Sequence, residues 1–229
     1  MIHYKKVFLP AFAAFALGLA AFSPAGAQTA QTAQSAHASA ESAETPQVLI
    51  QRVTQEVLEI ARNDKDVKAG DRKRIHQLVE TKILPHVDFQ RTTSMAVGRY
   101  WREASPQQQQ QLVGEFRSLL MHTYAGALSQ IGTQKPDFKP QRSHADESEA
   151  EVRFQVSQGR GGDPMQLSYR LHKSADGWKV YDVNLLGAWL VETYKGSFAA
   201  EIGKSGIDGL IRSLSEKNRK LASTPAPKA

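Results

Sequence analysis

The first half of the chain carries apolar residues at helical spacing. They recur every three or four residues over 48–60 and again over 75–83, which is the pattern of two amphipathic helices. Pro85 ends the second pattern because proline disfavours helical backbone in the residue before it. Asp88 can cap a third helix, which we predict to end at about Val97.

A fourth helix begins with the clearest local signal in the sequence. Ser105 fits the N-cap position, Pro106 the first helical position and Gln108 the third, as a capping box requires. We predict that this helix runs to about Gln130 and lies at the centre of the fold. One of its faces is apolar along its whole length and consists of Leu112, Val113, Phe116, Leu119, Leu120, Tyr124 and Leu128.

After this helix the spacing of apolar residues falls to every second residue, which indicates β-strands. Apolar and polar residues alternate in two stretches, and a third stretch has apolar residues on both faces. Turn sequences at 159–163 and at Asp176-Gly177 separate the stretches, so neighbouring strands are expected to pair antiparallel. The predicted strands are residues 152–156, 165–171 and 178–183, with a shorter strand near Phe138.

After Gly187 the helical period returns, first in a helix through Trp189 and Ile202 and then in a last helix through Ile207 and Leu214. Helices, then strands, then helices predict an α+β fold. The expected architecture is a curved antiparallel sheet of about four to five strands, wrapped by N- and C-terminal helices and enclosing an apolar pocket.

The N-terminal residues show the order of features found in a secretory signal peptide. Lys5 and Lys6 give a positive start, residues 7–22 are mainly apolar, and Ala25-Gly26-Ala27 is an A-x-A cleavage pattern. An uncleaved membrane anchor is the alternative, but the apolar run is short for a span. We therefore expect residues 1–27 to be a signal peptide that is removed after about Ala27 on export to the periplasm.

Amino-acid composition predicts where the folded domain begins and ends. Residues 28–45 are mainly Ala, Gln, Ser and Thr without any large apolar side chain, so they are expected to form a disordered tether. Residues 222–229 contain two prolines and are expected to form a disordered tail. Residues 46–221 are then one folded domain, which is long enough to bury a core without disulfides.

Net charge and cysteine content restrict the classes of partner and site that the chain can have. The 229-residue chain has a formal net charge of +6, which falls to +4 when residues 1–27 and their two lysines are removed. This mild basicity favours an anionic surface or an acidic partner and gives no reason to expect nucleic acid. The lack of cysteine excludes a disulfide scaffold, a catalytic thiol and a cysteine-ligated metal.

Candidate catalytic groups are few. No histidine has another histidine four residues away, as a helical metal site would require, and the acidic run 146–151 lacks the glycine-punctuated loop of a calcium site. His86 with Asp88 and His122 with Tyr124 are close in sequence, but Asp88 is more simply a helix cap, and residues two apart on a helix diverge. We predict no catalytic residue, no metal site and no cofactor.

Several short runs resemble, in the same order, those of the MlaC family. They are LPHVDF at 84–89, VGRYWR at 97–102, ASPQQ at 104–108, GWKVYDV at 177–183 and GIDGLI at 206–211. Each run is weak alone, whereas the ordered series, which covers about residues 46–216, is specific. Members of this family are the periplasmic phospholipid-binding component of the Mla lipid-transport system and are also called toluene-tolerance proteins.

The resemblance implies that residues 46–221 form a lipid-binding domain and not an enzyme. It implies a deep apolar pocket with the acyl chains inside and the head group outside. It also implies a monomeric carrier that shuttles phospholipid between an outer-membrane lipoprotein–porin complex and an inner-membrane ABC transporter complex with its substrate-binding-domain subunit. Outer-membrane lipid asymmetry would be maintained in this way.

The bulky residues of the predicted strands and helices are the candidates for lining this pocket. Any one of them can instead be ordinary core. An NTF2-like-fold pocket enzyme, such as an isomerase or dehydratase, and a protein-binding module of the cell envelope stay open as alternatives. The predicted lipid-binding residues are Val97, Leu120, Tyr124, Phe154, Val156, Leu167, Tyr169, Val180 and Leu190, with Trp178, Trp189 and Tyr194 nearer the mouth.

Overall fold

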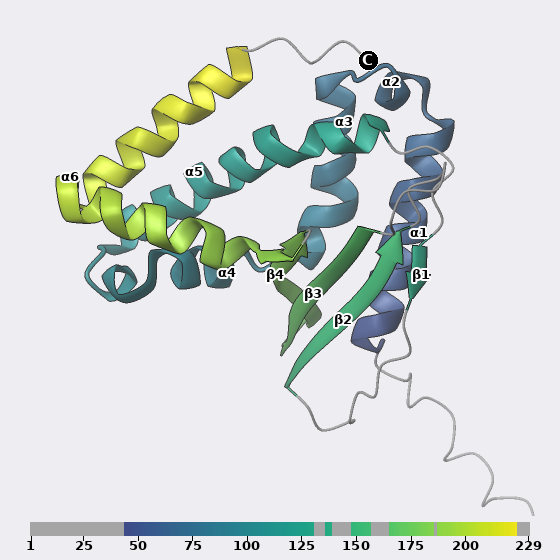
Figure 1. Ribbon diagram of the computed structural model, residues 1–229, viewed down its shortest axis with the longest axis horizontal. Coiled ribbons are helices and arrows are strands. Elements are labelled where there is room, and N and C mark those ends of the chain that lie inside the picture. Colours follow the sequence, from purple (N-terminus) through teal and green to yellow (C-terminus); the bar gives the residue numbers. More distant parts are fainter. Residues whose placement is uncertain (1–43, 131–135, 139–147, 157–164, 186, 224–229) are drawn as a thin grey trace, which may run out of the picture. The chain divides into compact units, whose positions relative to one another are not determined.

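The computed structural model describes residues 44–130, 136–138, 148–156, 165–185 and 187–223, all of which lie in a compact unit formed by residues 42–229 (Figure 1). The predicted signal peptide, most of the predicted tether, the turn at 159–163 and most of the predicted tail lie outside the described residues.

The first two predicted helices are present, with a short helix between them. Thr45 caps the first helix by accepting a hydrogen bond from the Val48 amide at 3.2 Å. The ion pair between Glu44 and Arg52, at 2.8 Å, holds the residue before this cap. The elements are α1 (Pro46–Asn63), α2 (Lys65–Lys68), α3 (Arg72–Leu78), the π-helical turn η1 (Val79–Ile83) and the 3₁₀ turn η2 (Leu84–His86).

The helix capped by Asp88 is also confirmed. The Asp88 side chain accepts a hydrogen bond from the Arg91 amide at 2.8 Å. This helix is α4 (Phe89–Val97), and the 3₁₀ helix η3 (Gly98–Arg102) follows it.

The predicted capping box forms in full at the start of the next helix, α5 (Pro106–Tyr124). The Gln108 amide donates to Ser105 Oγ at 3.2 Å, and the Ser105 amide donates to Gln108 Oε1 at 2.9 Å. The prediction that this α-helix runs to about Gln130 is wrong, because α5 ends at Tyr124. The last six residues of the predicted helix form the 3₁₀ helix η4 (Ala125–Gln130) instead. Helices often tighten at their ends, and Gly126 in this stretch disfavours regular α-helix.

The strands form one antiparallel sheet in which each strand pairs with its neighbour in sequence. The third predicted strand has apolar residues on both faces because the register shifts. Arg170 faces Asp182, whereas Leu171 faces Val180, so Tyr181 is an extra residue, as in a β-bulge. The strands are β1 (Pro136–Phe138), β2 (Glu149–Val156), β3 (Met165–Ser174), β4 (Gly177–Leu185) and β5 (Ala188–Trp189).

The two predicted C-terminal helices form one element, α6 (Leu190–Ser223), that is interrupted at Gly206. The backbone there has φ 72° and ψ 179°, a conformation that is essentially restricted to glycine. The second part runs two residues past the predicted end of the domain. Arg72 holds its last turn by donating to the carbonyl oxygens of Leu221 and Ala222 at 3.1 and 3.0 Å.

Buried apolar residues gather in three separate clusters. A helical cluster joins α4, α5 and α6, a sheet cluster joins the sheet to α1, and an N-terminal cluster joins α1, α2, α3 and η1 to Ala125. Figure 1 shows the sheet with α1 on one side and α4, α5 and α6 towards the other. Among the described residues, no helix has both the length and the apolar character that a membrane crossing requires.

Candidate functional site

One face of the sheet is apolar. In the antiparallel register, Val152 on β2 faces Tyr169 on β3, which faces Val183 on β4. Directly paired residues share a face of the sheet, so these side chains form a row across three strands. A second row lies beside it and consists of Phe138, Phe154, Leu167 and Leu185. The rows together make a continuous apolar surface.

Three aromatic rings lie in contact across this surface. The rings of Phe138 and Phe154 have centroids 4.8 Å apart. Phe154 and Tyr169 stack at 5.7 Å with an interplanar angle of 11°. Burial raises the pKa of the Tyr169 phenol to about 12, and its hydroxyl forms no hydrogen bond with any residue that the structure describes. The face therefore offers stacked rings and a low-dielectric surface to whatever covers it.

The apolar face is only partly covered by the rest of the protein. Leu49 and Ile50 of α1 are buried against it, and Val53 and Val87 pack at its border. By contrast, four side chains on the face itself keep part of their surface accessible: Leu167, Tyr169, Trp178 and Val183. These four partly accessible side chains leave apolar surface on the face that a ligand can cover.

The structure brings half of the twelve predicted lipid-binding residues to this face. Phe154 and Val180 are buried in the sheet cluster, and four more pack around them: Val156, Leu167, Tyr169 and Trp178. The register places all six on the apolar side. The alternation of the sequence predicts this for the four residues on β2 and β3, but not for Trp178 and Val180 on β4.

The other six predicted residues lie elsewhere. Val97, Leu120 and Tyr194 belong to the helical cluster, where Tyr194 packs edge-on against Phe116 with centroids 4.9 Å apart. Burial raises the pKa of the Tyr194 phenol. Tyr124 is 39% exposed, and Leu190, the first residue of α6, is half-buried outside the three clusters. A contact of these residues with a ligand stays a prediction.

The sixth, Trp189, lies on the opposite, polar face of the sheet. Its partner in the register is Asn184, and the Arg170 guanidinium lies 3.7 Å from the centre of its ring. Arg170 is in turn 3.6 Å from Asp182. Asp182 accepts hydrogen bonds from the Val183 and Val191 amides, at 2.9 and 3.0 Å, so Trp189 belongs to the structure that fixes the start of α6.

Sequence reasoning missed the contribution of α1 to the site. Leu49 and Val53 belong to the apolar repeat predicted over residues 48–60, whereas Ile50 was not among its residues. Periodicity alone does not say which surface such a face covers. Val87 was missed for the same reason, since its bridge to Val180 joins segments about 90 residues apart in sequence.

The acid/base candidates have structural roles. Asp88 caps α4, and its second oxygen lies 2.9 Å from His172 Nε2, so it pairs with the sheet and not with His86. His122 lies against His76, with ring centroids 5.3 Å apart. Within the described part of the chain, no group of three or more His, Cys, Asp or Glu side chains is placed to hold a metal ion.

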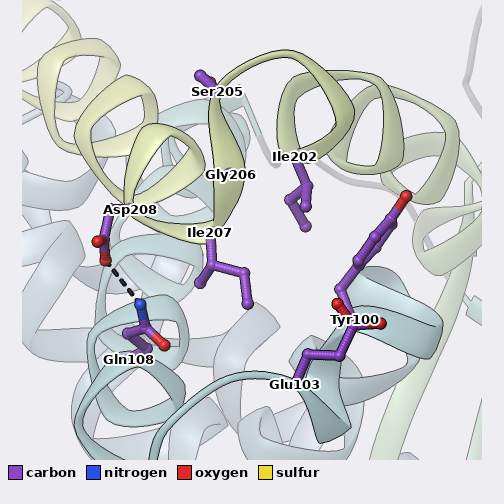
Figure 2. A pocket seen from close by; sticks show the side chains of 8 residues that line it. All are labelled: Tyr100, Glu103, Gln108, Ile202, Ser205, Gly206, Ile207 and Asp208. Atoms are coloured by element: carbon purple, nitrogen blue, oxygen red, sulfur yellow. Dashed lines mark hydrogen bonds between the residues drawn. The ribbon is translucent and has the colours of Figure 1, made fainter.

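The described residues also contain a hollow of about 440 Å³, which none of the twelve predicted residues lines. It lies at the break in α6, beside η3 and the start of α5 (Figure 2). Its lining includes the carboxylates of Glu103 and Asp208. Acyl chains would leave these charges without solvation, so the sheet face is the better candidate for an apolar ligand.

A family model described as MlaC protein matches residues 51–216. This match spans more than half of the 229 residues. The chain belongs to the MlaC family. The resemblance found in the short sequence runs is thereby confirmed.

Two curated relatives support membership of the MlaC family. The intermembrane phospholipid transport system binding protein MlaC of Haemophilus influenzae is 26% identical over 175 residues, covering 75% of this chain and 81% of the relative. The toluene tolerance protein ttg2D of Pseudomonas putida is 26% identical over 165 residues, covering 72% of this chain and 76% of the relative.

A solved structure has a higher sequence identity to this chain. The phospholipid-binding protein of Ralstonia solanacearum, determined in complex with a phospholipid, is 44% identical. It superposes with a TM-score of 0.73 and covers 77% of this chain and 98% of that structure. The α+β fold with one antiparallel sheet, as predicted from the sequence, is therefore shared with a protein that binds a phospholipid.

Proposed function

We propose that this chain is a periplasmic carrier that holds the acyl chains of a phospholipid against the apolar face of its sheet. The observation that carries the proposal is the incomplete cover of that face, where Leu167, Tyr169 and Val183 are half-buried. The 44% identity to a protein that was solved with a phospholipid supports it.

The physical need for such a carrier follows from the hydrophobic effect. Two acyl chains contain about 30 methylene groups, and at ~0.8 kcal/mol each their exposure to water would cost roughly 24 kcal/mol. A carrier must offer nearly the burial of a bilayer, yet it must also release its cargo. A dry apolar face without a buried charge fits both needs, because it binds chains by area and places no strong bond on the head group.

The carrier would exchange its phospholipid with membrane complexes on both sides of the periplasm. We propose an outer-membrane lipoprotein–porin complex and an inner-membrane ABC transporter complex as these partners, with maintenance of outer-membrane lipid asymmetry as the result. The name of the H. influenzae relative, an intermembrane transport system binding protein, supports this role. Residues 1–27 would direct export, and cleavage after Ala27 would leave Gln28 as the first residue.

Catalysis is not part of the proposal. An enzyme in this fold needs an acid or base in contact with a substrate on the apolar face. Among the described residues of the sheet cluster, Tyr169 supplies the titratable group, and its raised pKa keeps the phenol protonated. The Asp88–His172 pair is used to join α4 to the sheet.

Native mass spectrometry of the protein purified from bacteria without detergent tests the proposal. We expect a stoichiometric mass increment that denaturing extraction identifies as a phospholipid, and the mass of the lipid gives its number of acyl chains. A protein that is bare after purification and takes no phospholipid from liposomes would refute the carrier function. The pocket enzyme and the protein-binding module would then come first.

A further inference from the structure

Tyr169 brings a polar atom to the middle of the apolar face of the sheet. It lies on β3, which is flanked by β2 and β4 (Figure 1), and its partners in the register are Val152 and Val183. Leu167 and Leu171, two positions away along β3, share its face because the side-chain period of a strand is two. These four neighbours are aliphatic, so their side chains cannot accept a hydrogen bond from the phenol.

The ring of Tyr169 is held in place, but its hydroxyl is unused. The ring stacks on Phe154 with centroids 5.7 Å apart and an interplanar angle of 11°. The hydroxyl has no hydrogen-bond partner among the described residues. Burial raises the pKa of the phenol to about 12, so at neutral pH the group is protonated and acts as a donor.

The unpartnered hydroxyl is also open to ligand or water. Among the described residues, one polar side-chain atom is both enclosed and without a partner, and it is Oδ1 of Asn218. The Tyr169 hydroxyl, which lacks a partner too, therefore reaches open space and can bond to water in the free protein. Acyl chains that cover Leu167 and Val183 would displace this water. The hydroxyl must then find an acceptor on the lipid or lose its hydrogen bond.

Trp178 is the other hydrogen-bond donor among the described residues of the sheet cluster. It pairs with Lys173 next to the turn at Asp176 and Gly177, both of which are exposed. Four residues of β3, or about 13 Å, separate this pair from Tyr169. The indole can thus reach solvent at the turn, and Tyr169 is the donor that a bound lipid would isolate.

A phospholipid offers two kinds of acceptor to such a donor. The methylene groups of the acyl chains have none, but each chain begins with a neutral ester carbonyl, and the head group carries an anionic phosphate. The described residues of the sheet cluster include no lysine or arginine. A phosphate on this face would therefore be buried without a counter-charge, which is unfavourable, whereas an ester carbonyl needs no counter-charge.

We propose that the Tyr169 hydroxyl donates a hydrogen bond to an ester carbonyl of the bound phospholipid and so fixes how far the acyl chains enter the site. This inference rests on the carrier function proposed above. Contact area over the rest of the face would hold any acyl chain, but this bond forms only with a lipid that has an ester at that depth. The protein should therefore prefer diester phospholipids to diether phospholipids, which lack the carbonyl oxygens.

Competition between two matched lipids tests the proposal in one sample. Purified protein is incubated with liposomes that contain equal amounts of dioleoyl phosphatidylglycerol and its di-O-oleyl ether analogue, and mass spectrometry counts the bound lipids. The diester-to-diether ratio should be about three- to tenfold higher for wild type than for Tyr169→Phe, as expected for one hydrogen bond. This variant keeps the ring, and any difference in how firmly the liposome retains the two lipids affects both proteins alike.

Tyr100→Phe is the matched control. It removes a tyrosine hydroxyl that bonds to Arg99 at 2.8 Å and lies outside the sheet cluster, so it should keep the wild-type ratio. Infrared spectroscopy of lipid that is isotope-labelled at the ester carbonyl carbons gives a second readout. The carbonyl stretch of bound lipid should have a low-frequency, hydrogen-bonded component in wild type, and Tyr169→Phe should lose this component.

Three results would overturn the proposal. They are the same lipid ratio for wild type and Tyr169→Phe, an unchanged carbonyl band, and equal loss of both lipids from the variant, which would assign the hydroxyl to the head group or to an ordered water. In each case the wild-type protein still carries lipid. A wild-type protein that takes up neither lipid would instead count against the carrier function, so the two failures are distinguishable.

Discussion

A charged substitution at Leu167 gives the most direct test of lipid binding to the apolar face of the sheet. This residue lies on the central strand β3, between Phe154 on β2 and Leu185 on β4, and it is half-buried in the sheet cluster. The substitution Leu167→Asp places a carboxylate in the middle of the surface that acyl chains would cover. In the free protein this carboxylate keeps part of its hydration, whereas bound lipid would remove it.

The expected loss has two parts. Loss of the leucine side chain removes about three methylene equivalents of contact, or about 2.4 kcal/mol at ~0.8 kcal/mol each. Burial of an unpaired carboxylate adds several kcal/mol. Together they exceed about 5 kcal/mol, and at 1.4 kcal/mol per factor of ten the affinity should fall by more than about a thousandfold.

The assay is transfer of a fluorescent phospholipid from liposomes to the protein, with native mass spectrometry of the purified variant beside it. Ser168→Asp is the matched control, because it adds the same charge one residue away on the opposite face, where Arg153 is its neighbour in the register. Circular dichroism checks that both variants fold. A folded Leu167→Asp protein with one lipid per chain, or loss of lipid from Ser168→Asp, would refute the assignment of the face.

Three further predictions concern stability, measured as the free energy of unfolding in urea. Ser105→Ala breaks the capping box of α5 and should cost about 1 kcal/mol; an unchanged value would contradict the role of this cap. Gly206→Ala should cost about 1–3 kcal/mol because the φ there is +72°, whereas Gly203→Ala, inside the helical part with open space around it, should not destabilise; equal effects would refute the argument from conformation. Burial alone would raise the pKa of Glu149, but hydrogen bonds from Arg91 and a tyrosine hold it below the usual 4.5. Because the pKa of Glu149 is lower in the folded protein than in the unfolded chain, its ionised carboxylate stabilises the folded state at pH values above the unfolded pKa. This stabilisation is lost as the pH falls through the folded pKa, so the wild-type protein should lose more free energy of unfolding than Glu149→Gln between pH 7 and 3.5.

Local chemistry explains what the sequence predicted well. Ser105 and Asp88 cap helices through bonds to residues three positions away, and such bonds need no knowledge of the rest of the fold. The alternation of β2 and β3 also fixed which side chains share a face, because the side-chain period of a strand is two. Four of the predicted lipid-binding residues came together for this reason: Phe154, Val156, Leu167 and Tyr169.

Long-range packing explains what the sequence left open. Tyr194 and Tyr169 are equally bulky in sequence, yet one packs on Phe116 between helices and the other stacks on Phe154 in the sheet. Trp189 lies on the polar face because it pairs with Asn184. The bulge at Tyr181 puts Asn184 on that face, opposite Ser168. These outcomes depend on pairings between distant segments, which a pattern within one segment does not encode.

The cover that α1 gives the sheet has a consequence for how the chain reaches its final state. A polypeptide emerges from the ribosome or from a translocation channel with its N-terminus first, so Leu49 and Ile50 appear about 100 residues before Val152, their neighbour in the sheet cluster. The strands pair in order of sequence and can assemble as hairpins as they emerge. Throughout that interval the apolar stripe of α1 has no strand to cover, and it is then a target for chaperones or for the apolar stripe of a second nascent chain.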